Sequence, residues 1–284
     1  MTATLVRPSA PAAAKISLSD FRKGSPKLPP RVAMHGRAGV GKTETAGNAP
    51  EPVFILSPGE TGLHVLQDMG RLGSDIPNIE VADWATYMGA IEALRTEQHG
   101  RKTLVIDTIN GVEKIANVHE ANTSYGGDLS ARGFGNYQAG YRSMVAGIWK
   151  QMLQALDRLR VERQMMVILL AHTMVGSHKN PSGDDYNRWI PAFDGKLAWD
   201  SLYGWADVVL MADFEIFTLR TNSNDKNSKA KATGGQRRFF HTQWNPAWDA
   251  KNRHNMPAEL EMGASGAEAW ANLAKAMQPS ADAK

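Results

Sequence analysis

The stretch GRAGVGKT at residues 36–43 decides the fold. It fits the phosphate-loop pattern G-x-x-x-x-G-K-[ST] at every fixed position. Glycines let backbone N–H groups turn inward around phosphate oxygens, and the helix that follows presents its positive N-terminus to the same anion. Lys42 is placed to reach the β- and γ-phosphates of ATP, and Thr43 offers a hydroxyl to Mg²⁺. The residues expected to bind the nucleotide are Gly36, Arg37, Ala38, Gly39, Val40, Gly41, Lys42, Thr43 and, in the first helical turn, Glu44.

Apolar strands and amphipathic helices alternate along the chain on both sides of this loop. The sequence predicts strands over 31–36, 51–57, 79–82, 102–107, 165–171 and 206–212, and helices over 41–47, 84–98, 112–122, 143–163 and 266–277. A late β-hairpin is expected from 214–220 and 238–243 with a polar tip over 221–236, after a long polar connection over 172–204. Such alternation predicts an α/β fold, a mainly parallel β-sheet flanked by helices.

Composition shifts divide the chain into three parts. Residues 1–28 are rich in Ala, Pro, Ser and Lys and predict a disordered N-terminal arm. An ATPase domain is expected over 29–262, and a C-terminal helix and tail over 263–284. The absence of cysteine excludes a disulfide framework and a thiolate zinc site and suits a reducing cytoplasm. No apolar run is long enough to span a bilayer, so no membrane association is expected, and the net charge of +3 permits a polyanionic partner.

Three further side chains are candidates for catalysis. Asp107 ends the apolar strand of KTLVIDT, where a carboxylate can hold Mg²⁺; alternatively it caps the helix that begins near Gly111. Because Thr108 follows, the acid that polarises the attacking water must come from elsewhere, and Glu60, just after VFILS, is the candidate, against the alternative of a solvated loop acid. His172 ends the strand MMVILLA and is either a sensor of the γ-phosphate or a histidine satisfied by local backbone.

The order of these parts resembles the RecA-type ATPase core. More closely, it resembles the compact phage RecA-like proteins, ATP-binding proteins of the single-strand-annealing and recombination type with an AAA-like ATPase domain. The matching pieces are GRAGVGKT, VFILS leading to Glu60, LVIDT, LLAHT and AKNRHNMP, over roughly residues 30–262. One departure is Pro58, which stands where the family often carries Asp and which, with Gly59, would turn Glu60 away from the water.

The resemblance implies a role for each matching residue. Lys42 and Thr43 would contact ATP, Asp107 would bind Mg²⁺, Glu60 would be the hydrolytic acid, and His172 would be the switch. Lys251 and Arg253, in AKNRHNMP, would reach the nucleotide of a neighbouring subunit. The resemblance also implies a homo-oligomer, a ring or filament, that assembles on single-stranded DNA in the cytoplasm of a bacterial host cell.

Two loops are candidate contacts for that DNA. Residues 123–141 mix aromatic side chains and Arg132 with glycines, and aromatic rings can stack on unpaired bases. Residues 173–199 follow His172 directly and include His178, Lys179, Arg188 and Trp189. The alternative for the aromatic rings is that they pack the domain. The tip of the late hairpin adds positive charge, with six basic residues from Arg220 to Arg238 against Asp225 alone, and its alternative is a solvated surface.

Two other functions share the phosphate loop. A small-molecule kinase would place its acceptor pocket in residues 123–141, and a non-hydrolysing ATP-binding accessory factor would make no use of Glu60. Strand order distinguishes the kinase from the RecA type. In RecA-type sheets, the strand that ends at His172 lies between the strand before the phosphate loop and the strand that ends at Asp107. In kinases, the strand before the phosphate loop and the strand that ends at Asp107 are neighbours.

Overall fold

The computed structural model describes residues 17–21, 24, 27–220 and 230–278. The strands are β1 (Arg31–Gly36), β2 (Pro52–Leu56), β3 (Asn78–Glu80), β4 (Thr103–Asp107), β5 (Met166–His178), β6 (Tyr186–Pro191), β7 (Val208–Arg220), β8 (Ala230–His241), β9 (Lys251–Asn252) and β10 (Glu259–Glu261). The α-helices are α1 (Lys42–Gly47), α2 (Gly62–Asp68), α3 (Trp84–Thr96), α4 (Ile109–Ser124), α5 (Ala139–Met144), α6 (Lys150–Glu162), α7 (Lys196–Trp205) and α8 (Gly266–Ala276). Short 3₁₀ helices cover Leu18–Asp20 and Asn136–Gln138, and a π-helical turn, Val145–Trp149, joins α5 to α6.

The central sheet has the strand order β10-β8-β7-β1-β5-β4-β2-β3. The pairs from β7 through β1, β5, β4 and β2 to β3 are parallel, and β8, β9 and β10 are antiparallel additions at the other side. The predicted α/β fold with a mainly parallel sheet and a late hairpin is therefore confirmed. Since β5 lies between β1 and β4, the strand order is the one expected for the RecA type, and the kinase alternative is wrong by the criterion stated above.

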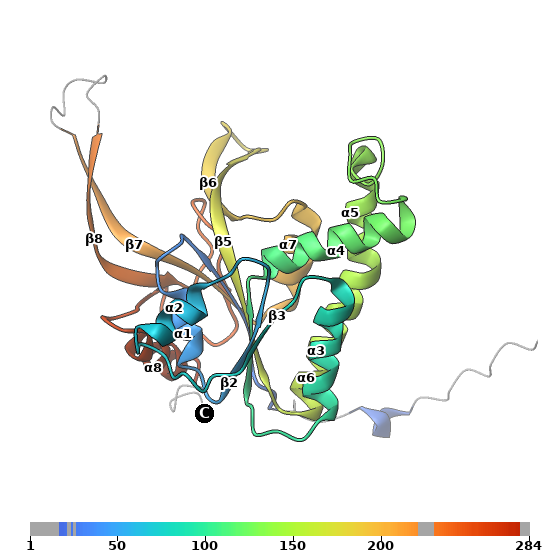
Figure 1. Ribbon diagram of the computed structural model, residues 1–284. Coiled ribbons are helices and arrows are strands. Elements are labelled where there is room, and N and C mark those ends of the chain that lie inside the picture. Colours follow the sequence, from blue (N-terminus) through green and yellow to red (C-terminus); the bar gives the residue numbers. More distant parts are fainter. Residues whose placement is uncertain (1–16, 22–23, 25–26, 221–229, 279–284) are drawn as a thin grey trace, which may run out of the picture.

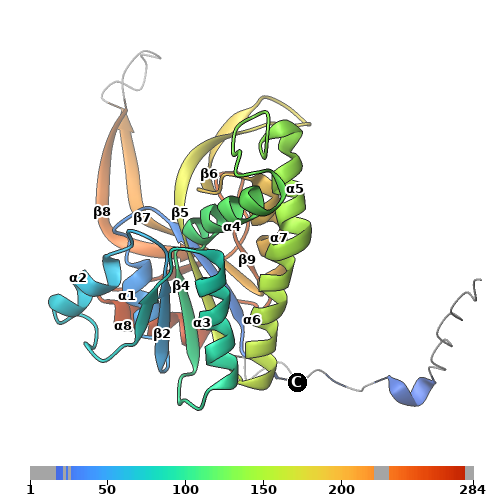
Figure 2. The ribbon, with the colours of Figure 1, turned by 45° about the vertical axis from the view of Figure 1, so that its right-hand side comes forward.

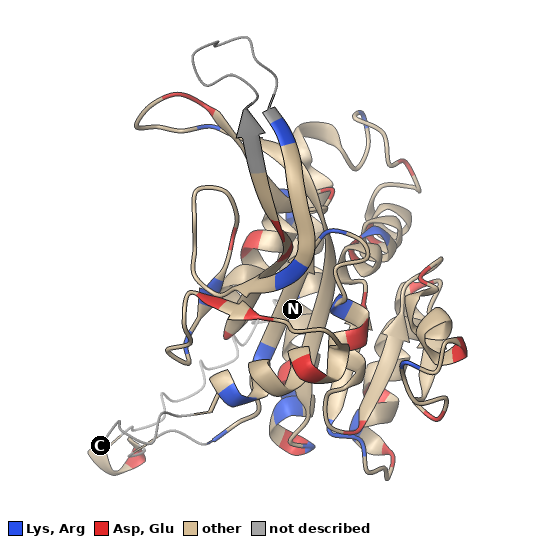
Figure 3. Cartoon of the chain, turned by 90° about the vertical axis from the view of Figure 1, so that its left-hand side faces the viewer, with Lys and Arg blue, Asp and Glu red and all other residues tan. Residues whose placement is uncertain are grey.

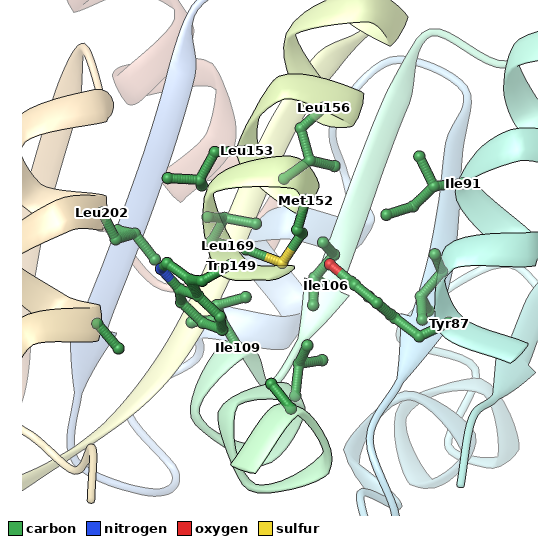
Figure 4. Packing of buried hydrophobic residues seen from close by; sticks show 14 of the residues in the cluster. Tyr87, Ile91, Ile106, Ile109, Trp149, Met152, Leu153, Leu156, Leu169 and Leu202 are labelled. Atoms are coloured by element: carbon green, nitrogen blue, oxygen red, sulfur yellow. The ribbon is translucent and has the colours of Figure 1, made fainter. Parts of the chain in front are cut away.

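Helices cover both faces of the sheet, in two layers visible in Figure 1. On one face, α3 to α7 close over a large apolar core in which Trp149 and Met152 pack beside Ile106 and Leu169 (Figure 4). All four of these side chains are fully buried. Loss of packing contacts in such a core costs stability. The helices of this layer therefore hold β4 and β5, and with them the residues at the ends of these strands, in place.

The second core lies on the opposite face, under α1, α2 and α8. Its members include Leu63 of α2 and Trp270 and Leu273 of α8, packed on Met34 and Leu210 of the sheet. The start of α8 lies so close to α1 that a Cβ on Gly266 would lie 2.4 Å from Cγ of Glu44. This contact holds the short helix that follows the phosphate loop.

Residues 172–204 were expected to be an irregular polar connection, and this prediction was wrong. β5 continues to His178, beyond the sheet edge, and pairs there with β6 as an antiparallel hairpin, after which α7 forms. Polar residues such as Ser177, Asn187 and Arg188 interrupt the apolar alternation by which these strands could have been predicted. The short helix α2 was also not predicted.

The loop predicted over 123–141 is confirmed for residues 125–135, which form turns and irregular structure, while α4 runs to Ser124 and helical residues begin again at Asn136. Its aromatic residues mostly pack the domain: the Phe134 ring is buried and makes edge contacts with Tyr125 and Tyr141. Tyr137 is the exception and is exposed. The proposed polar tip of the late hairpin lies partly outside the described residues, and strand β8 already begins at Ala230. Most of the predicted N-terminal arm also lies outside them.

Among the described residues, no helix combines the length and apolar character that crossing a membrane requires.

Candidate functional site

Four neighbouring strands end at one edge of the sheet and define the site. In the parallel register, Gly36 lies opposite His172, and Asp107 lies opposite Leu170 on one side and Leu56 on the other. The phosphate loop, the turn to Glu60, Asp107 and His172 therefore converge because each follows the carboxyl end of a strand. In open α/β sheets, ligands bind at this edge.

The phosphate loop has the backbone form that its glycines permit. Gly39 and Gly41 have φ angles of +78° and +101°, a conformation that L side chains rarely adopt. Lys42 begins α1, and its buried ammonium donates to the carbonyl oxygens of Gly36 and Arg37 at 2.8 and 3.0 Å. Burial lowers the pKa of Lys42 to about 8. Within the described residues it forms no ion pair, so a phosphate in the loop would supply its counter-charge.

Asp107 and Thr43 present oxygen atoms side by side. The Thr43 hydroxyl donates to Oδ2 of Asp107 at 2.7 Å, and burial raises the pKa of Asp107 to about 6. The alternative that Asp107 caps the next helix is wrong, because the N-cap of α4 is Thr108, whose Oγ1 accepts from the backbone N–H of Gly111. Asp107 is therefore free to act toward a cation.

Glu60 faces the same site despite Pro58 and Gly59. Its Oε1 accepts from Nε2 of His172 at 3.1 Å and from the hydroxyl of Thr108 at 3.2 Å. The hydrogen bond from His172 lowers the pKa of Glu60, which favours the carboxylate. The alternative of a solvated loop acid is therefore wrong for the position of Glu60. The backbone of His172 is fixed on both sides, since its N–H donates to Oδ1 of Asn110 and its carbonyl accepts from Ala192.

These groups line one cavity of about 350 Å³ between the loop, α2 and β8. Nine of the residues predicted from sequence line it: Ala38, Gly39, Gly41, Lys42, Thr43, Glu44, Glu60, Asp107 and His172. Two arginines that the sequence did not indicate, Arg71 and Arg238, line it as well. The guanidinium of Arg238 donates to the carbonyl oxygens of Val40 and Gly263, and a Cβ on Gly41 would lie 2.5 Å from its Nη1.

Arg238 reaches the loop only because β8 pairs with β7, which in turn pairs with β1. Local sequence around Arg238 contains no signal of this contact. It appeared there only as one of several basic residues of the late hairpin.

Some predicted nucleotide-binding residues have their side chains elsewhere. Arg37 points away from the cavity, with its guanidinium 4.5 Å from the centre of the Trp189 ring and 3.4 Å from Asp213. Val40 is buried in the second core. Glu44 lines the cavity but holds Arg71 in a two-pronged ion pair, with its shorter contact at 2.6 Å. Arg37 and Val40 could therefore contact a nucleotide through their backbone groups alone. Glycine is required at position 36 by packing, because a Cβ there would lie 2.2 Å from the Ala212 carbonyl oxygen.

Lys251 and Arg253 lie away from this cavity. Lys251 is on β9, which pairs with the start of β7, and its ammonium donates to the carbonyl of Tyr203. Arg253 donates to Asp207 at 3.0 Å. Burial opposes ionisation of Asp207, but Arg31 and Arg160 outweigh it and bring its pKa to about 2. Neither residue contacts the nucleotide cavity of its own chain, and the role toward a neighbour stays a prediction.

Residues 28–254 match the AAA domain family. The chain belongs to this family of P-loop ATPase domains. A comparison with curated proteins gave no match. Membership in the AAA domain family implies nucleotide binding, usually with Mg²⁺, and ATPase activity.

The residues at the loop fit the nucleotide and metal of an AAA ATPase domain. The glycines leave a backbone cradle beside a buried ammonium without a counter-charge, as a triphosphate requires. Thr43 and Asp107 supply the hydroxyl and carboxylate oxygens that Mg²⁺ uses alongside substrate phosphates and water. Lys42 and Arg238 would contact phosphates, and Thr43 and Asp107 would hold the metal.

Proposed function

We propose that this AAA domain protein hydrolyses ATP and acts on single-stranded DNA, promoting annealing or strand exchange, as phage RecA-like recombination proteins do. The observation that carries the proposal is the contact between Glu60 and His172 at the nucleotide cavity. It joins a candidate catalytic base to the strand that leaves the site as the β5–β6 hairpin. Nucleotide state and a surface far from the cavity are therefore connected by one strand.

Each residue has a distinct chemical task in this proposal. Water would attack the γ-phosphorus of bound ATP, the bond from that phosphorus to the β–γ bridging oxygen would break, and ADP and phosphate would be released. Glu60, kept ionised by the hydrogen bond from His172, orients that water and accepts its proton at a carboxylate oxygen. Lys42 neutralises negative charge on the phosphates, and Thr43 and Asp107 hold the metal ion.

His172 would report the presence of the γ-phosphate. Because Nε2 of His172 donates to Glu60, a change at Glu60 alters this hydrogen bond. The backbone of His172 is in turn hydrogen-bonded to Asn110 of α4 and to Ala192, the residue after β6. The next residue, Thr173, starts the pairing of β5 with β6. Arg188 and Trp189 of this hairpin are occupied within the protein, by Asp249 and Arg37. DNA contact by the hairpin would therefore fall to residues at its tip, such as Lys179, which is exposed although it pairs with Asp185.

We propose further that the protein acts as a homo-oligomer, a ring or filament. Lys251 and Arg253 are far from the cavity of their own chain, as residues that serve a neighbouring subunit would be. Arg253 keeps about half of its side chain exposed while it pairs with Asp207. Light scattering during size-exclusion chromatography, with and without Mg·ATP and an oligonucleotide, tests the assembly.

ATP turnover of the purified full chain, with and without single-stranded DNA over a salt series, tests the function. We expect DNA to stimulate turnover, and the stimulation to fall as salt rises, because contacts to the DNA backbone release counterions. Glu60→Gln should retain ATP affinity and lose about 10²-fold or more of the turnover. Lys42→Ala should lose nucleotide binding. A parallel assay of annealing between two complementary labelled strands tests the recombination step itself.

The non-hydrolysing accessory factor predicts other results. In that case the purified chain would show no ATP turnover above background with or without DNA, Glu60→Gln would leave that background unchanged, and Lys42→Ala would still abolish ATP binding. These outcomes would contradict the proposal that the protein hydrolyses ATP, and only the proposal that it binds ATP would remain.

A further inference from the structure

A second cavity, of about 480 Å³, shares a wall with the nucleotide cavity. Glu60 and His172 line both. The rest of the second cavity is formed by the turn before α2, the start of α3 and one face of α4, and α3 and α4 lie next to each other in the ribbon views (Figure 2). Its volume is in the range of small-molecule sites in proteins, about 300–1,000 Å³.

One face of α4 supplies most of the chemistry of this cavity. Lys114, Val118 and Asn122 recur every four residues along it, so a helix places them in one row. His119 is beside this row, and its ring centre is 6.3 Å from that of Trp84, at an interplanar angle of 32°. Trp84 is almost completely buried, and the His119 ring beside it is more accessible.

Lys114 gives the cavity one cationic group that can hold an anion. Asp83 and Glu60 also line it, and hydrogen bonds from Thr86 and from His172 lower the pKa values of these two carboxyl groups, so both stay ionised. An anion is therefore attracted by the ammonium of Lys114 and not by the cavity as a whole. Lys114 is exposed and makes no ion pair with any described residue. The cavity thus offers a flat ring, an ammonium and the amide of Asn122 within one helix face.

We propose that this cavity binds one unpaired nucleotide of a single-stranded DNA. The base stacks on His119, beside Trp84, and the adjoining backbone phosphate is neutralised by Lys114. The inference rests on the proposed action on single-stranded DNA and names where the strand meets the catalytic pair. A base in the cavity contacts the side of Glu60 and His172 that faces away from ATP, so DNA binding acts on the catalytic base directly.

Binding of fluorescein-labelled oligo-dT to the full chain, followed by anisotropy, measures the contribution of each group. Lys114→Ala and His119→Ala should each weaken binding by about tenfold. Lys114→Ala should also reduce the slope of log Kd against log salt by about 0.7, the value for one phosphate contact on a single strand. His119→Phe keeps a ring and should bind within about twofold of the wild type. Lys102→Ala is the control, because Lys102 is an exposed lysine at the other end of β4.

Crosslinking locates the strand. An oligonucleotide with 5-iododeoxyuridine at every second position should crosslink, on irradiation, to a peptide that contains residues 114–122. The ratio of DNA-stimulated to basal ATP turnover should fall with Lys114→Ala and His119→Ala and not with Lys102→Ala. Thermal unfolding of each variant shows that it is folded.

Each other outcome has a definite meaning. If the wild type binds and responds to DNA but both cavity variants behave like Lys102→Ala, with crosslinks in residues 173–191 instead, the cavity proposal is wrong and the proposed function stands. If the wild type binds no DNA, both are wrong. Free dTMP is the remaining arm: if it binds, if the two variants lose that binding, and if no strand binds, the cavity belongs to mononucleotides and the strand proposal is overturned.

Discussion

His35, the residue before the phosphate loop, should make the protein sensitive to acid. Its ring is completely buried, where Nε2 donates to the carbonyl of Asp249 at 2.7 Å and Nδ1 accepts from the hydroxyl of Thr173 at 3.1 Å. Burial lowers the pKa of His35 from 6.5 to about 4. The unfolded chain therefore binds a proton between these two values that the folded protein does not bind.

The sign and size of the effect follow from this difference. A histidine with a depressed pKa stabilises the folded state fully above pH 6.5, and this contribution is lost as pH falls toward 4. Between pH 7 and pH 5, linkage gives a loss of about 2 kcal/mol from His35 alone. That is a large fraction of a typical domain stability of about 5–15 kcal/mol.

Urea unfolding at pH 7 and pH 5 measures this loss, with His35→Gln as the reference. Glutamine can still donate to Asp249 but does not titrate, so the difference between wild type and variant cancels other titrating groups. The stability of the wild type should fall by about 2 kcal/mol more than that of His35→Gln. Equal losses in the two proteins would refute the reasoning, since they would mean that the ring reaches water or is already charged.

Three more predictions concern the loop and its supports. Gly36→Ala should cost about 1–3 kcal/mol or more in urea unfolding, because its Cβ would meet the carbonyl of Ala212 at 2.2 Å; wild-type stability would contradict the observed strand spacing. Thr43→Val keeps the side-chain shape and should lower ATP turnover at saturating Mg²⁺ by at least about tenfold, while the Kd for ATP measured with EDTA is unchanged; full turnover would exclude the hydroxyl from the metal site. Glu113, on which the backbone N–H groups of Asp194 and Gly195 converge, has a pKa raised by burial from 4.5 to about 7. A raised carboxyl pKa makes stability fall as pH rises from 5 to 8, by about 2.5 kcal/mol, and Glu113→Gln should remove this slope; an identical slope in both proteins would show that Glu113 is ionised throughout.

The parts of the site that the sequence predicted are those encoded by local pattern. Lys42 and Thr43 follow from the spacing of the loop glycines, and Asp107 and His172 follow from their places at the ends of apolar strands. Glu60 was located correctly, but its contact with His172 depends on β2 and β5 lying on either side of β4, which strand order fixes and local sequence does not.

The parts that were missed depend on contacts between distant segments. Arg238 reaches the phosphate loop through two successive strand pairings, and Thr108 replaces Asp107 as the helix cap through its own backbone conformation. The β5–β6 hairpin was missed because polar residues interrupt the apolar alternation of its strands. Charge is similarly distributed in space rather than along the chain: Figure 3 shows basic and acidic residues interspersed over the β7–β8 face, so a count of lysines and arginines does not predict a basic surface.

The buried ring of His35 also bears on how the site and the hairpin move together. His35 is the residue before Gly36, and Thr173 is the residue after His172, so their hydrogen bond joins the exits of the two strands that define the site. Asp249 completes the connection, since its carbonyl accepts from His35 and its carboxylate accepts from Arg188 of β6. A displacement of the phosphate loop relative to the hairpin would break hydrogen bonds whose groups are buried, at a cost of about 1–3 kcal/mol for each unsatisfied group. The hydrogen bonds of His35 and Asp249 therefore oppose a displacement of the loop relative to the base of the hairpin, and they join the two in addition to the contact between Glu60 and His172.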